Sequence, residues 1–152
     1  MRKIGTIENH YHVYMNDKKK FIIKFETENH TIAIDNIKWF DENSEETLNF
    51  VADLILDDVV VGRCSNAGRG GNADYGIDNN DYSLVREIVK EVSEIDNYCF
   101  PSMKENFSDV LDVLANKNVT FIENKVKTIK KAKEIIGIYQ KNAETYRAKY
   151  SH

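Results

Sequence analysis

Hydrophobic and polar residues alternate along much of the first forty positions, in the pattern of an antiparallel sheet with one buried face. The segments YHVYM (11–15) and FIIKFET (21–27) both alternate, and NDKKK between them is typical of a turn. If Met15 pairs with Phe21, one face collects the apolar residues of both segments: Tyr11, Val13, Met15, Phe21, Ile23 and Phe25. A two-residue hairpin at Glu28–Asn29 adds Ile32 and Ile34 to that face. Residues 1–40 are therefore predicted to form a meander of about three to four strands.

Apolar residues at helical spacing follow this region and predict a cover for its apolar face. Residues 41–61 contain a capping box at Asn43 and Glu46, and they are predicted to form an acidic helix. Its apolar stripe consists of Leu48, Val51, Ala52, Ile55 and Val59. The sequence VVV at its end also fits a short strand.

Residues 81–117 predict two more helices. The first is capped by Asn80 or Asp81, and its stripe is Tyr82, Val85, Val89 and Val92. The second opens at the capping box Ser102–Glu105 after Pro101, and its stripe is Phe107, Val110, Leu111 and Leu114. NVTFIEN (118–124) fits a short strand that rejoins the sheet. The predicted fold class is α+β: one domain, 1–152, in which an N-terminal antiparallel meander is covered by about four helices.

The last predicted helix, 125–150, is long and basic. Its apolar positions are spaced alternately by three and four residues, which is a 3.5-residue repeat. One interpretation is a helix that lies along its own domain. The other is a seam that pairs with a second copy, giving a homodimer or higher oligomer through Ile129, Ile136, Tyr139 and Tyr146.

Composition narrows the class of protein. A net charge of −4 argues against nucleic-acid binding by the whole surface. No apolar run reaches the length of a membrane helix or a signal peptide, so we expect a cytoplasmic protein with free thiols at Cys64 and Cys99. The 16 lysines, 16 asparagines and 16 isoleucines against five arginines suggest an AT-rich gene, as in a low-GC bacterium or its phages.

Charge is unevenly distributed along the chain. Residues 41–60 hold seven acidic residues and no basic one, whereas residues 117–149 hold nine basic and three acidic residues. These segments are either two solvated faces or, for one of them, a contact surface for a partner of opposite charge.

Five of the seven glycines lie between Gly62 and Gly76, within a predicted loop over residues 62–80. GRGGNA (68–73) fits a dinucleotide fingerprint formally, but it neither leaves a strand directly nor opens a helix. A P-loop is excluded because no lysine follows. Three interpretations remain: a connection, an anion site built from backbone amides, or a partner contact. The candidate binding residues are Arg63, Arg69, Gly70, Gly71 and Tyr75.

Catalytic and metal chemistry find little support in the sequence. His10 and His12 share a strand face, but the register places His30 on the other face, so we expect no metal and no cofactor. Cys64 beside Arg63 is the only candidate nucleophile. We therefore expect a non-enzymatic protein that occludes a macromolecular partner. An inhibitor or immunity protein of the phage anti-defence type, acting on a nuclease, toxin or defence complex, fits best. The alternative is a binder that sequesters a nucleotide or another phosphate ligand through the glycine-rich loop.

Overall fold

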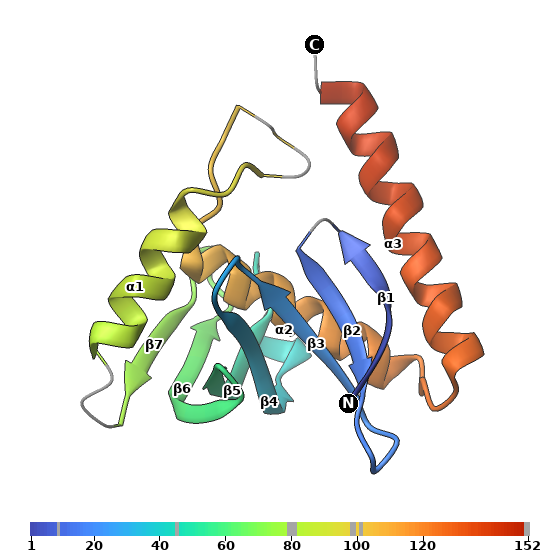
Figure 1. Cartoon of the computed structure of the whole chain (residues 1–152), viewed down its shortest axis with the longest axis horizontal. Helices are drawn as coiled ribbons and strands as arrows, with labels where there is room; N and C mark the ends of the chain where they lie inside the picture. The colour runs from blue at the N-terminus through green and yellow to red at the C-terminus, as the bar shows by residue number, and fades with distance from the viewer. Residues whose placement is uncertain (9, 45, 79–81, 98–99, 101, 151–152) are drawn as a thin grey trace.

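In the computed structural model, which describes all residues except 9, 45, 79–81, 98–99, 101 and 151–152, seven antiparallel strands form one sheet. Each strand pairs with its neighbour in the sequence (Figure 1). The strands are β1 (Arg2–Glu8), β2 (Tyr11–Met15), β3 (Phe21–Glu26), β4 (Thr31–Trp39), β5 (Asn49–Leu56), β6 (Val59–Ala67) and β7 (Asp74–Ile77). A 3-10 turn, η1 (Asp41–Asn43), precedes β5, and three helices follow the sheet: α1 (Tyr82–Ser93), α2 (Phe107–Glu123) and α3 (Ile129–Tyr150).

The predicted register of the N-terminal strands is confirmed. Met15 pairs with Phe21, and Phe25 pairs with Ile32. The Thr27 amide donates to the His30 carbonyl at 2.9 Å, which closes the two-residue hairpin at Glu28–Asn29. The shared apolar face forms part of the core, because alternation alone decides which side chains point toward the helices.

The predicted architecture of three to four strands under about four helices is wrong. Over residues 41–80, the strands β5, β6 and β7 replace the acidic helix (41–61) and most of the glycine-rich loop (62–80), which leaves a seven-stranded sheet and three helices. In β5 every second residue is buried: Phe50, Ala52, Leu54 and Leu56. Val51 and Ile55 add two apolar residues to the opposite face, beside Asn49 and Asp53, so the segment fits a helical period as well as a strand period. Asp57 and Asp58, with φ of 50° and 66°, then form the turn that returns the chain into β6.

The helix α2 is longer than predicted and replaces the strand expected at 118–124. Its N-cap is Asn106, whose Oδ1 accepts from the amides of Ser108 and Asp109, so the helix does not open at the Ser102–Glu105 box. The predicted stripe is buried as expected. Packing against β3 and β4 also buries Val119 and Phe121, and this tertiary burial overrides the local strand tendency of the β-branched segment.

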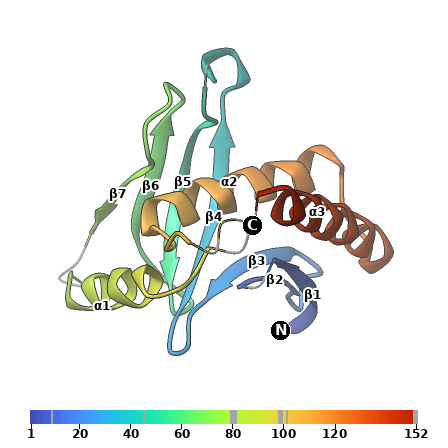
Figure 2. The same ribbon diagram turned by 90° about the horizontal axis from the view of Figure 1, so that it is seen from above.

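The sheet curves around α2, which lies across its middle strands (Figure 2). The core between them draws on the sheet and on all three helices. In α1 the structure buries Val85, Ile88 and Val92, whereas Tyr82, predicted for the buried stripe, is exposed. The caps predicted at Asn80 and Asp81, the predicted thiol Cys99 and Pro101 lie outside the described residues.

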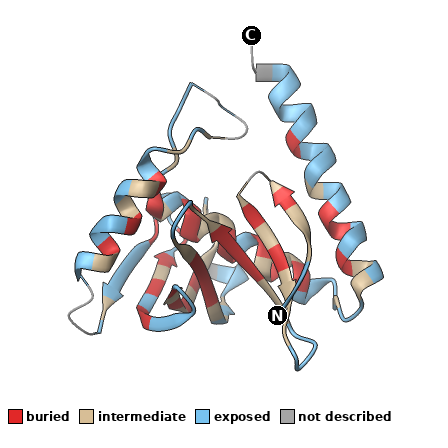
Figure 3. Cartoon of the chain, viewed as in Figure 1, coloured by how far each residue is buried: buried red, intermediate tan, exposed pale blue. Residues whose placement is uncertain are grey.

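The helix α3 packs along the edge strand β1 and buries one side of its first half (Figure 3). A Cβ at Gly5 of β1 would lie 3.2 Å from Ile136 Cδ1, so the two elements are in close contact. The Tyr139 ring lies 4.3 Å from the ammonium of buried Lys117. Two residues of the predicted seam, Ile136 and Tyr139, are thus used within the chain, while Ile129 is half-buried and Tyr146 is exposed. Self-association through α3 stays a prediction.

No helix within the described residues combines the length and the apolar content that a membrane span requires.

Candidate functional site

The glycine-rich segment is held by hydrogen bonds from its flanks. Asn66, buried at the end of β6, accepts from the Gly68 amide at 2.8 Å and donates to the Gly71 carbonyl at 2.9 Å. The same amide group donates to Asp112 of α2, whose other carboxylate oxygen accepts from the Ala73 amide at 3.1 Å. Residues 68–73 therefore form a short turn tied to the core, instead of the long loop that the sequence predicts.

Three of the six backbone amides of residues 68–73 already donate hydrogen bonds within the chain. Gly68 donates to Asn66, Gly70 donates to the Thr47 hydroxyl, and Ala73 donates to Asp112. The positive φ of Gly68 and Gly70, 82° and 93°, explains why glycine stands at these two positions. An anion would have to displace these bonds and approach the carboxylates of Glu46 and Asp112. The geometry therefore disfavours the phosphate cradle.

The predicted contact residues do not assemble into one surface. Arg63 and Tyr75 occupy opposite faces of the β6–β7 pair, because Arg63 pairs with Gly76 while Cys64 pairs with Tyr75. Tyr75 is 39% exposed and packs edge-to-face on Phe107, at 4.9 Å between ring centroids. Arg69, Gly70 and Gly71 are exposed at the turn.

The candidate nucleophile is unsuited to catalysis. Cys64 lies in strand β6 and is buried, and burial raises the pKa of its thiol to about 12, with smaller contributions from Asp112 and Asp53. Its thiolate is therefore scarce near neutral pH, and the hypothesis of an enzyme that uses Cys64 is not supported.

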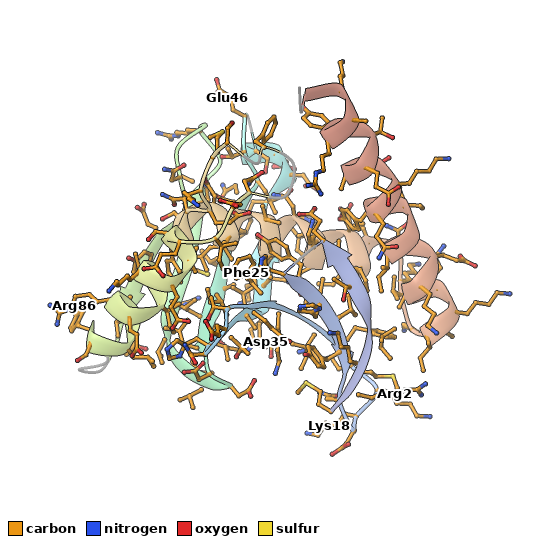
Figure 4. The ribbon with its side chains drawn as sticks, turned by 45° about the horizontal axis from the view of Figure 1, so that its top comes forward. Arg2, Lys18, Phe25, Asp35, Glu46 and Arg86 are labelled. Atoms are coloured by element: carbon orange, nitrogen blue, oxygen red, sulfur yellow. The ribbon has the colours of Figure 1, made fainter. Side chains whose placement is uncertain are left out.

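A larger concave site lies at the opposite end of the molecule. We call it the lysine groove, and it has a volume of about 920 Å³. Three separate segments line it: the β2–β3 turn, the irregular part of β4 around Asn36, and the end of α2 with the residues that follow it. Figure 4 shows Lys18 and Arg2 at this end and Glu46, beside the glycine-rich turn, at the other. Its charged rim consists of Lys18, Lys19, Lys20, Lys125, Lys127 and Asp35.

The floor of the lysine groove is apolar. The rings of Phe21 and Phe121 meet edge-to-face at 6.2 Å between centroids, which joins β3 to α2 beneath the rim. Ile122, at 49% exposed, presents a large apolar side chain to this space. The remaining apolar lining residues are Ile23, Ile37 and Val126. An apolar floor within a mainly cationic rim suits a ligand that is both apolar and anionic.

Most of the positive charge at the rim is not neutralised. Lys20 pairs with Asp35 at 2.6 Å. Among the residues that the structure describes, no acidic group forms an ion pair with Lys18, Lys19, Lys125 or Lys127. The register pairs Arg2 with Met15, directly before the β2–β3 turn, so a further cation lies at the same end.

Two of the rim lysines occupy backbone conformations that favour glycine. Lys19 has a φ of 60° at the αL position of the β2–β3 turn, where its amide donates to the Asn16 carbonyl. Lys125 has a φ of 52° directly after α2. Its amide donates to the Ile122 carbonyl and the Val126 amide donates to the Phe121 carbonyl, which is a Schellman motif with lysine in the glycine position. A side chain costs about 1 kcal/mol at such a position.

Sequence reasoning missed the lysine groove. It recognised the basic character of residues 117–149, but it treated NDKKK only as a turn. The signal that could have found the site was a pair of lysine-rich segments, KKK (18–20) and KVK (125–127), at predicted element ends. Only the tertiary fold shows that these ends meet.

Comparisons of the chain with protein-family models, with curated proteins and with solved structures found no match.

Proposed function

We propose that this chain is a non-enzymatic binding protein that occludes an acidic protein partner at the lysine groove. The observation that carries the proposal is the placement of Lys19 and Lys125 in left-handed conformations at the rim of one groove. A position that favours glycine on conformational grounds but holds lysine favours a role for the lysine charge. Two such positions, far apart in the sequence, face the same space.

The groove also suggests the chemistry of the partner. Its floor offers contacts for apolar anchors such as leucine or phenylalanine, and such buried anchors supply most of the affinity at interfaces. The lysines would steer an acidic segment toward the floor and raise its association rate. We therefore propose that the partner presents an acidic segment with interspersed apolar side chains.

Occlusion alone is a sufficient mechanism for an inhibitor or immunity protein. We propose that role, of the phage or mobile-element anti-defence type, with a nuclease, toxin or defence complex as the partner. We further propose that the protein acts in the cytoplasm, where the free thiol of Cys64 stays reduced.

The test is charge reversal in the groove with a matched control. The variant Lys125→Glu/Lys127→Glu alters the rim, and Lys133→Glu/Lys141→Glu makes the same charge change at exposed positions of α3. Each protein is titrated with a synthetic peptide of alternating glutamate and leucine while the backbone amide resonances are recorded. Affinity capture from cells that encode the chain then compares the same three proteins.

We expect the peptide to shift the resonances of residues 18–20 and 121–127, and the groove variant to lose both the peptide and the captured partner. The control should retain both. An equal loss of binding in the groove variant and in the control would show that only the net charge of the protein matters, and it would contradict the proposal. A nucleotide complex that is lost in Arg69→Ala would place the function at the glycine-rich turn instead. Capture of a partner that is insensitive to groove charge would contradict the role of the groove.

A further inference from the structure

A second cluster of polar residues lies away from the lysine groove, where the β3–β4 turn, the β5–β6 turn and α1 meet. His30 comes from the first turn, Asp57 from the second, and Glu87 and Glu91 from consecutive turns of α1. The His30 side chain is only 10% exposed. The cluster therefore joins a buried imidazole to three carboxylates from elements that are distant in sequence.

The hydrogen bonds of Asp57 determine the protonated nitrogen of His30. One carboxylate oxygen of Asp57 accepts from the Thr31 amide at 2.9 Å, and the other lies 2.7 Å from His30 Nδ1. A carboxylate only accepts, so the proton of a neutral His30 is on Nδ1 and the lone pair is on Nε2. A carboxylate that holds the far nitrogen in this way is the usual support of a histidine that binds a metal.

The other nitrogen, Nε2, is buried and without a hydrogen-bond partner in the part of the chain that the structure describes. Glu91 Oε2 lies 3.1 Å and Glu87 Oε1 lies 3.4 Å from it, but neither oxygen meets the geometry of a hydrogen bond. The lone pair of Nε2 thus points toward the two carboxylates, and no donor among the described residues forms a hydrogen bond with it.

Glu91 is itself positioned by the β3–β4 turn. Its Oε1 accepts from the Thr27 hydroxyl and from both the backbone and side-chain amides of Asn29, at 3.2 to 3.3 Å. Its Oε2 is left to face His30. The orientation of one carboxylate oxygen toward Nε2 is therefore a consequence of three bonds to the other oxygen.

We propose that His30 Nε2, Glu87 and Glu91 bind a divalent transition-metal ion of the zinc class, with Asp57 as the support of His30. The three ligand atoms lie within 4.8 Å of one another. Two ligands about 2.1 Å from a tetrahedral zinc ion are roughly 3.4 Å apart, close to both distances from Nε2. One imidazole with two carboxylates suits zinc better than calcium, which takes oxygen ligands.

A proton is the competitor for this place. Burial lowers the pKa of His30, but the interactions of the imidazole with Asp57, Glu87 and Glu91 outweigh burial, and the pKa is raised. An imidazolium would offset one of three negative charges, whereas a divalent ion offsets two and uses the lone pair directly. The ion would tie α1 to two turns of the sheet. The exposed side of Glu87, at 62%, leaves room for water as a fourth ligand.

The experiment titrates the metal-stripped full chain with Zn²⁺ by calorimetry and with Co²⁺ by visible absorption. Glu87→Gln is the main variant, because this exposed residue can be changed without disturbing the core. Asp57→Asn tests the support of His30. Glu28→Gln removes a neighbouring exposed charge and is the matched control. His12→Gln tests whether His10 and His12 bind the metal instead. Circular dichroism confirms that each variant is folded.

We expect one equivalent of Zn²⁺ and a Co²⁺ spectrum of tetrahedral intensity. Affinity should fall about tenfold or more in Glu87→Gln and in Asp57→Asn, and stay unchanged in Glu28→Gln and His12→Gln. Absence of binding, together with a histidine resonance that titrates above the ordinary range, would assign the cluster to a proton and overturn the proposal. Binding that survives Glu87→Gln and Asp57→Asn would overturn it as well.

Discussion

The glycine-rich turn and the lysine groove lie at opposite ends of the molecule, and they differ in the relation between residue type and backbone conformation. In the turn, Gly68 and Gly70 stand where φ is positive, and the polar groups around them bond to one another. In the groove, Lys19 and Lys125 stand at positive φ, and their ammonium groups face solvent. The glycine-rich turn, which stands out in the sequence, is held by hydrogen bonds within the fold. Lys19 and Lys125, which do not stand out, form no ion pair with a described residue.

The difference shows which observation points toward function. Local structure explains three of the five glycines in residues 62–76. Gly68 and Gly70 have positive φ, and a Cβ at Gly62 would clash with the backbone carbonyl of Gly76 in the paired strand β7. Lysine at a position that favours glycine is not explained by local structure, and neither is a ring of lysines around an apolar floor. A mismatch between residue and conformation is therefore the more informative signal.

The largest effect is expected from Asn66→Ala, which removes the centre of the glycine-rich turn. The substitution deletes bonds to Thr47, Gly68, Gly71 and Asp112 and leaves the half-buried carboxylate of Asp112 with one donor fewer. The free energy of unfolding should fall by about 2–4 kcal/mol. Urea denaturation measures it, with exposed Asn72→Ala as the control, expected within about 0.5 kcal/mol of the parent. A similar small change in Asn66→Ala would show that the turn is not held as described.

A smaller loss is expected from Gly70→Ala. Its φ of 93° disfavours any side chain, and a Cβ would clash with a carboxylate oxygen of Glu46, which must move away. We expect a loss of about 1–2 kcal/mol. A Cβ at Gly71 meets no atom within 4 Å, so Gly71→Ala should be nearly neutral in the same thermal or urea assay. Equal effects at the two glycines would contradict the role assigned to φ.

The smallest effect has the opposite sign. Lys125→Gly should raise the free energy of unfolding by about 0.5–1 kcal/mol, because it relieves the left-handed lysine at the end of α2. It should also weaken binding of the acidic probe peptide. Lys127→Gly is the control. It should weaken peptide binding without raising the free energy of unfolding, because the φ of Lys127 is not positive. A lower free energy of unfolding in Lys125→Gly would contradict the argument that this lysine is kept for its charge at a position whose conformation favours glycine.

The sequence predicted the N-terminal sheet correctly because its signal is local. Alternation from Tyr11 to Ile34 determined the faces, and the length of the NDKKK and Glu28–Asn29 turns determined the register. It failed over residues 49–67, because Val51 and Ile55 on the outer face of β5 complete a helical stripe, and the turn uses two aspartates instead of asparagine and glycine. It also failed at 118–124, where burial of Val119 and Phe121 extends α2.

Of the two candidate sites, the lysine groove needs three segments to meet, and the His30 cluster needs two turns and a helix. Neither arrangement is encoded within one window of sequence. The predicted register even argued against His30 as a ligand, because it compared His30 only with His10 and His12. The partners of His30 lie on α1 and the β5–β6 turn, 27 to 61 positions further along the chain.

The sequence by itself determined the alternating faces of the first strands, the buried stripe of α2 and the segregation of basic residues toward the C-terminus. These follow from periodicity and composition, which need no knowledge of distant contacts. Only the tertiary structure decided that the glycine-rich segment is a tied turn, that residues 49–67 are strands, and that lysines from two chain segments share one groove. Those outcomes depend on which surfaces pack together, and packing is a property of the whole chain.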